Sequence, residues 1–136
     1  MMDGTGAESL TTSDGRIDHT AVQRRITELK AQAVSDAEQF SPPASPPDPE
    51  NAQTYLTEGA GQAIGLYVVV RTGGRLYPFS KEEFEALEAA MNTWFQLYAA
   101  CFGETITPSV SIRTAAHALI DTEDIGDVAK IVTNIP

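Results

Sequence analysis

The 136-residue sequence has a single cysteine, Cys101, and two histidines, His19 and His117. One cysteine excludes an intrachain disulfide and a cysteine-rich zinc site. The histidines are far apart and lack metal-ligand spacing, so we expect no metal and no cofactor. Cys101 and His117 could form a Cys–His nucleophile pair, but the apolar pattern around Cys101 favours a buried, inert thiol. We therefore expect no catalytic residues and a protein that is not an enzyme.

Long apolar runs are also missing. The longest uncharged stretches, 59–70 and 89–103, are shorter than the ~18–20 apolar residues that a transmembrane helix needs. The beginning of the sequence lacks the basic start and the apolar segment of a secretory signal. We expect a cytoplasmic protein that does not enter a membrane.

Lysine is scarce in this acidic sequence. Nineteen acidic residues face nine basic ones, of which six are arginine, and the formal net charge is −10. Such a surface suits high salt, because screening suppresses the repulsion between carboxylates. Binding to nucleic-acid backbones needs clustered lysine and arginine, so we expect no nucleic-acid partner.

Apolar residues divide the chain into four parts. Residues 1–17 contain few large apolar side chains and are predicted to be a disordered tail. Residues 18–40 have the pattern of an amphipathic helix. Residues 41–53 contain five of the eight prolines and are predicted to be a semi-rigid linker. The remaining residues, 54–136, carry most of the apolar side chains and are predicted to form a helical core domain.

The first predicted helix starts in a T-x-x-Q capping box at Thr20. Val22, Ile26 and Leu29 follow at helical spacing and form one thin apolar stripe. A single stripe cannot bury itself. This helix must therefore pack on the core domain, on a second copy of the chain or on another protein.

The clearest helix covers residues 81–102. Ser80 and Glu83 have the spacing of a capping box, and Phe79 and Phe84 that of a hydrophobic staple. The apolar seam of this helix consists of Phe84, Leu87, Met91, Trp94, Tyr98 and Cys101. Such a seam, with further apolar residues beside it, predicts the central and most buried element of the fold.

Two shorter helices are predicted at the end of the chain. The first covers 108–120, with Thr107 and Pro108 as a helix-start pair. The second covers 122–135, with Thr122 as its N-cap. A strand around 109–113 is the alternative for the first of them.

Three glycines, Gly59, Gly61 and Gly65, have a spacing close to that of a dinucleotide-binding loop. Such a loop needs an apolar strand before its first glycine, and the preceding residues contain none. The sequence therefore argues against a nucleotide site here and leaves two structural interpretations.

In the first interpretation, 51–72 is a helix that pairs with 81–102 as a helical hairpin in an all-α fold. Its seam would consist of Leu56, Ala60, Ala63, Tyr67 and Val70. Gly61 and Gly65 would then allow a neighbouring helix to approach closely. In the second, 64–79 is a β-hairpin in an α+β fold. The repeat along the seam favours the helix.

A possible ligand site contains Arg71, Arg75 and Tyr77, which could hold a carboxylate or phosphate. The alternative is that the arginines pair with nearby acidic residues such as Glu82 and Glu83. The sequence leaves both open and favours the ion pairs.

The run from Arg71 to Gly103, with the pattern RTGG…FS…E…W…LYA.CFG, resembles that of small uncharacterised haloarchaeal proteins. The resemblance implies no activity. Our first hypothesis is a non-enzymatic interaction or regulatory module that binds a protein partner or itself. The candidate interaction face consists of Val22, Ile26, Leu29, Trp94 and Tyr98. The second hypothesis is a small-ligand-binding protein or enzyme with the anion site near Arg71.

Overall fold

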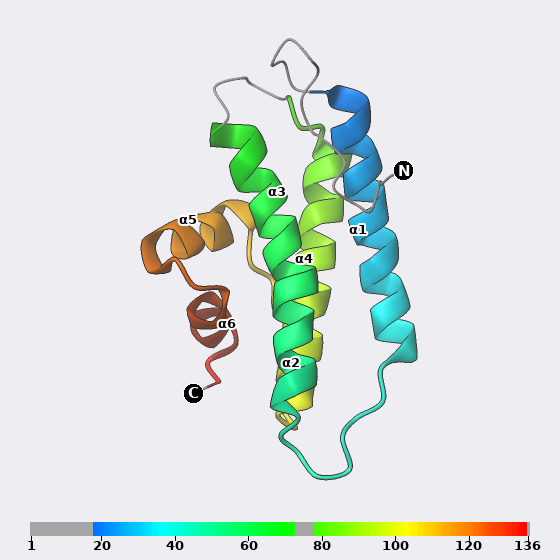
Figure 1. Cartoon of the computed structure of the whole chain (residues 1–136), viewed down its shortest axis with the longest axis vertical. Coiled ribbons are helices and arrows are strands. Elements are labelled where there is room, and N and C mark those ends of the chain that lie inside the picture. The colour runs from blue at the N-terminus through cyan, green and yellow to red at the C-terminus, as the bar shows by residue number, and fades with distance from the viewer. Residues whose placement is uncertain (1–17, 73–77, 136) are drawn as a thin grey trace, which may run out of the picture.

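The structure is a computed structural model that describes residues 18–72 and 78–135 (Figure 1). Every regular element within these ranges is a helix, which confirms the all-α prediction. The elements are α1 (His19–Gln39), α2 (Pro49–Tyr55), η1 (Leu56–Ala60), α3 (Gly61–Thr72), α4 (Lys81–Cys101), α5 (Ile112–Thr122) and α6 (Ile125–Thr133). The β-hairpin alternative is wrong, because its first half is part of α3. The predicted tail lies outside the described residues.

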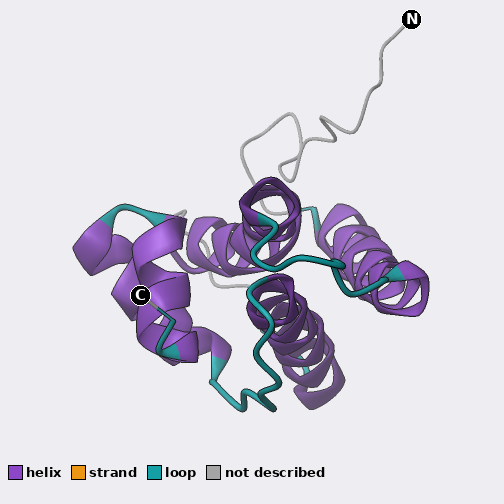
Figure 2. Cartoon of the chain, turned by 90° about the horizontal axis from the view of Figure 1, so that it is seen from below, coloured by secondary structure: helices purple, strands orange, loops and turns teal. Residues whose placement is uncertain are grey.

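Three long helices form the body of the molecule. They are α1, the continuous helix made of α2, η1 and α3, and α4, and they run alternately up and down (Figure 1). The short helices α5 and α6 lie on the side away from α1, as the view from below also shows (Figure 2). Helix α4 is the central element, because it contacts α1, α2, α3, α5 and α6.

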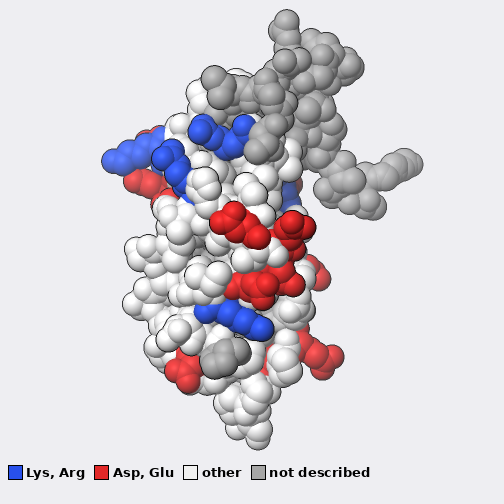
Figure 3. Space-filling view, turned by 90° about the vertical axis from the view of Figure 1, so that its left-hand side faces the viewer, with Lys and Arg blue, Asp and Glu red and all other residues white. Residues whose placement is uncertain are grey.

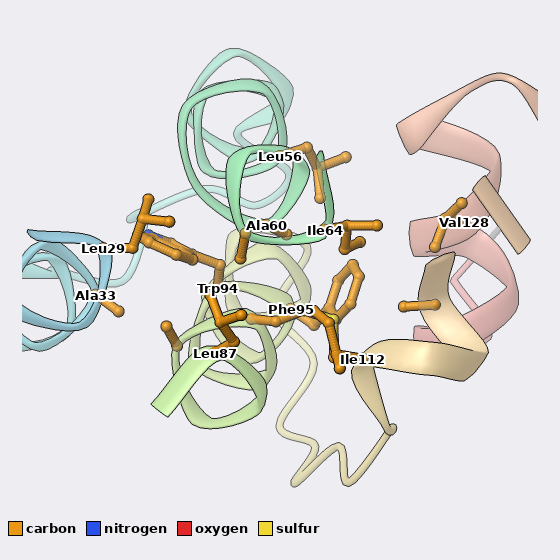
Figure 4. Packing of buried hydrophobic residues seen from close by; sticks show 14 of the residues in the cluster. Leu29, Ala33, Leu56, Ala60, Ile64, Leu87, Trp94, Phe95, Ile112 and Val128 are labelled. Carbon is orange, nitrogen blue, oxygen red and sulfur yellow. The ribbon is translucent and has the colours of Figure 1, made fainter. Parts of the chain in front are cut away.

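The core has two halves that meet at α4. Trp94 points toward α1 and lies close to Leu29, whereas Phe95 points toward α5 and α6 (Figure 4). Both rings are fully buried. The predicted seams are buried: Leu56, Ala60, Ala63, Tyr67 and Val70 on one helix, and Leu87, Met91, Trp94, Tyr98 and Cys101 on α4. Phe84, the first residue of the predicted α4 seam, is only partly buried. Helical periodicity therefore identified the faces that the fold buries.

The start of α4 has the predicted caps. The Ser80 hydroxyl accepts a hydrogen bond from the Glu83 amide at 3.1 Å, and the Glu83 carboxylate accepts one from the Ser80 amide at 2.8 Å. The rings of Phe79 and Phe84 lie 5.1 Å apart, centroid to centroid, as a staple requires. The capping box and the staple thus fix the direction in which the chain enters α4.

The other long helices begin earlier than the sequence indicated. Helix α1 is capped by Asp18, whose carboxylate accepts from the Ala21 amide at 3.1 Å, and not by Thr20. Helix α2 begins at Pro49 with Asp48 as its N-cap. Proline fits the first position of a helix because its missing N–H has no partner there in any case. The proline-rich connection is therefore shorter than predicted.

The two last helices begin later than predicted. Helix α5 starts at Ile112 after the N-cap Ser111, so neither a helix from 108 nor a strand at 109–113 forms. The Asn92 side chain donates to the Val110 carbonyl at 3.0 Å and accepts from its amide at 3.1 Å, which holds this segment in a non-helical conformation against α4. Helix α6 is capped by Asp124 and not by Thr122.

The three glycines have different roles from the predicted ones. A Cβ atom at Gly59 would lie 2.5 Å from the Trp94 ring, so the absence of a side chain at Gly59 allows η1 to lie close to α4. A Cβ at Gly61 would lie 2.7 Å from the Leu56 carbonyl oxygen, so Gly61 fits the π-turn of its own helix. A Cβ at Gly65 would meet nothing within 4 Å. The predicted packing role of Gly65 is therefore wrong.

Candidate functional site

The five residues predicted as an interaction face are buried inside the chain. Val22, Ile26 and Leu29 are at most 4% exposed, because α1 packs along α4. Trp94 and Tyr98 on α4 are at most 6% exposed. The stripe on α1 is thus satisfied within the chain. Any interaction surface of this protein consists of other residues.

A polar contact accompanies this packing. The Trp94 indole N–H donates to the Asp36 carboxylate at 2.8 Å, and the other carboxylate oxygen accepts from the Gln32 amide group at 2.7 Å. Asp36 lies in the last third of α1. It therefore links α1 to the middle of α4 across 58 residues of sequence.

A groove lies beside this contact. Helices α1 and α2 both pack on α4 and hardly touch each other, which leaves a space of about 1080 Å³ between α1 on one wall and α2 and η1 on the other. The lining residues are Arg25, Glu28, Leu29, Ala31, Gln32, Ser35, Asp36, Gln39, Phe40, Ser41, Asn51, Thr54, Tyr55 and Glu58. Most of them are polar. The sequence did not reveal this groove, because it depends on which helices fail to meet.

The groove has an acidic wall on each side. Arg25 is the one basic residue among the described residues that line it; it pairs with Glu28 at 3.4 Å and donates to Gln62 at 3.2 Å. Asp36 on α1 and Glu58 on η1 have no basic partner among the described residues. Three carboxylates against one guanidinium leave the groove negative.

A smaller pocket of about 180 Å³ lies between α3 and α5. Its lining residues are Tyr67, Val68, Arg71, Arg113, Ala116, His117 and Ile120. The Arg71 guanidinium lies over the Tyr67 ring, 5.9 Å from its centroid. Neither arginine forms an ion pair with another described residue, so the pairing of Arg71 with Glu82 or Glu83 is not observed.

Sequence reasoning found one half of this pocket. Arg71 is there, whereas Arg75 and Tyr77 lie outside the described residues. It missed Arg113 and considered His117 only as a partner of Cys101. The signal was present: Arg113, His117 and Ile120 recur at the i, i+4, i+7 spacing of one helix face.

Comparison with protein families matches residues 20–136 to a domain of unknown function, DUF8055. The chain belongs to this family. No curated protein and no solved structure gives a significant match. Within the described part of this DUF8055 domain, no helix is long and apolar enough to cross a membrane.

Cys101 and His117 lie in different parts of the DUF8055 domain. Cys101 is fully buried at the end of α4, whereas His117 is exposed on α5 beside the small pocket. The pKa of the Cys101 thiol is raised from 9.0 to about 11, mainly by burial and also by the nearby Asp48 carboxylate, while a hydrogen bond with Asn51 acts in the opposite direction. The two residues therefore do not form a nucleophile pair.

This environment predicts an unreactive thiol. At pH 8 the shift of about two pH units leaves roughly 100-fold less thiolate on Cys101 than an unfolded chain has. Alkylation by iodoacetamide, followed by mass spectrometry, should be at least that much slower in the native protein than in denaturant. The native rate should still rise between pH 9 and 10.5. Equal rates in both states would contradict the burial of Cys101.

Proposed function

We propose that this chain is a non-enzymatic protein-interaction module of a halophile-type cytoplasm, and that its groove between α1 and α2 binds a helix of a protein partner. The observation that carries the proposal is the groove itself: it is long, open and acidic. The strongly acidic composition, with three lysines, supports a salt-adapted host. The same net charge argues against nucleic acid as the partner.

The shape of the groove fits a helix. Residues 25–39 of α1 span one wall, which corresponds to about 22 Å along this helix. A helix of roughly 15 residues has that length. Placed between α1 and α2, it would be the fourth helix of a bundle whose other members are α1, the α2–α3 helix and α4. The rings of Phe40 and Tyr55, 6.2 Å apart, offer apolar contact at one end of the groove.

The charge of the groove selects the occupant. Asp36 and Glu58 on opposite walls favour a helix that carries lysine or arginine. A second copy of this chain is a poorer occupant, because two chains of charge −10 repel each other. At high salt the charges are screened, and the apolar contact with Phe40 and Tyr55 then contributes more of the affinity.

A pair of charge reversals tests the proposal. Glu58→Lys changes the groove, whereas Glu38→Lys makes the same change on an exposed part of α1 outside it. We expect affinity capture from the source cells, quantified by mass spectrometry, to lose its partners about tenfold with Glu58→Lys and to keep them with Glu38→Lys. Equal recovery with both variants would exclude the groove. Recovery of the chain itself, with a dimer mass in solution, would replace the proposed partner by a second copy.

A further inference from the structure

We infer that the pocket between α3 and α5 is a binding site for a small organic anion, a carboxylate or phosphate attached to an apolar body. This site is separate from the groove and does not depend on the function proposed above. Three side chains that can carry positive charge, Arg71, Arg113 and His117, line one pocket of a chain whose net charge is −10.

The cationic side chains come together because of helix periodicity on both walls. On α3, Tyr67 and Arg71 are four residues apart. On α5, Arg113 and His117 are four residues apart as well. Such pairs share one helix face. Helices α3 and α5 pack against each other, so the two faces form one concave surface.

The pocket lacks the acidic partners that usually neutralise arginines. Neither Arg71 nor Arg113 has an ion pair or a hydrogen bond to a carboxylate within residues 18–72 and 78–135. Asp121 on α5 does not line the pocket. Two guanidinium groups of the same sign in one pocket repel each other unless an anion lies between them. Arginine also has the planar donor geometry that carboxylate and phosphate groups match.

The position of Arg113 adds to this argument. It is the second residue of α5, and the first turn of that helix contains no acidic residue. A positive charge is unfavourable at a helix N-terminus, so Arg113 does not serve the stability of α5. The α5 amides are partly occupied already: Ile112 donates to the Glu88 carboxylate at 2.9 Å, and Thr114 donates to the Ser111 hydroxyl at 3.1 Å. The anion would therefore bind to the side chains.

The other lining residues define the rest of the ligand. Tyr67 is 5% exposed and its ring stacks on Phe79 at 5.6 Å, so it is a rigid wall that also holds the Arg71 guanidinium. Ile120 is 53% exposed and presents an apolar side chain beside the two arginines. With a volume of about 180 Å³, the pocket has room for a small apolar group next to the anion. On the face that carries α5, lysine and arginine lie in the upper part and again lower down, with acidic side chains between them (Figure 3).

The test is an NMR titration of the full chain with acetate, benzoate and inorganic phosphate, with chloride adjusted to hold ionic strength constant. We expect saturable shifts at His117 and at the Arg71 and Arg113 side chains, with benzoate binding more tightly than acetate because of its apolar ring. Arg71→Gln and Arg113→Gln should each weaken binding about tenfold or more, since each removes a charge-assisted hydrogen bond. Lys130→Gln, the same charge change on exposed α6, should leave the affinity unchanged.

The results separate the ligand classes. Tightest binding of phosphate indicates a phosphorylated ligand, and tightest binding of benzoate indicates a carboxylate; both support the site. The absence of saturable shifts with all three probes would overturn the inference. If Lys130→Gln weakened anion binding as much as the two arginine variants, the inference would also be overturned. The loss of affinity would then reflect the net charge of the protein and not this pocket. The backbone spectrum of each variant shows whether it is folded.

Discussion

Replacing Gly59 by alanine is expected to lower the free energy of unfolding by about 3 kcal/mol, the upper end of the usual range for an overpacked core. The added Cβ would lie 2.5–2.6 Å from three atoms of the Trp94 ring. The ring cannot move away easily, because it is fully buried and its N–H is bound to Asp36. Either the indole or the whole helix must shift.

Gly65 is the matched control for this experiment. It lies in the same continuous helix, and a Cβ there would meet nothing within 4 Å. Gly65→Ala should therefore raise the free energy of unfolding by about 0.5–1 kcal/mol, the difference in helix propensity. Urea unfolding curves of both variants measure the contrast. A similar change for the two variants would show that α2–α3 does not pack on Trp94 through Gly59.

The second large effect is expected at Trp94. Trp94→Ala removes the largest buried side chain, which α1, η1 and α4 all surround, and should cost about 4 kcal/mol. Asp36→Ala should cost about 2 kcal/mol, because it leaves a buried indole N–H without its acceptor. Gln32→Ala, which removes only the exposed hydrogen bond to Asp36, should change stability by less than about 0.5 kcal/mol.

A double-mutant cycle separates the hydrogen bond from the packing. Phenylalanine at position 94 keeps a buried ring and has no N–H to satisfy. In the Trp94→Phe background, Asp36→Ala should therefore cost much less than in the natural chain. Chemical denaturation of the four proteins gives the coupling energy. If Asp36→Ala has the same effect in both backgrounds, the contribution of Asp36 comes from α1 alone and not from its link to α4.

The buried faces could be predicted from the sequence because helical periodicity is a local property. The seam around Met91 and the stripe around Ile26 follow from spacings of three and four, and both are buried in the structure. The capping box at Ser80 is equally local and is confirmed. The predicted start of α5 was wrong because it depends on a contact distant in the sequence. Asn92, 18 residues away, holds Val110 outside the helix.

The candidate sites could not be predicted in full, since each depends on which helices become neighbours. The groove exists because α1 and α2 both pack on α4 but hardly contact each other. Arg71 gains Arg113 as a neighbour only through the packing of α3 on α5. The roles of the glycines depend on the rotation of one helix about its axis, and a G-x-G spacing does not specify that rotation.

The π-turn at η1 has a consequence for insertions and deletions. The Gly61 amide bonds to the Leu56 carbonyl five residues back, so this turn holds one residue more than an α-turn would. Deleting one residue between Leu56 and Ala60 would restore α-helical bonding and leave α3 facing nearly the same way relative to α2, because the wider π-turn absorbs the extra residue. Arg71 would then stay on the face that meets α5. A family member shortened by one residue at this point would keep both the bundle and the cationic pocket, whereas a deletion in a regular stretch of α3 would rotate Arg71 away by about 100°.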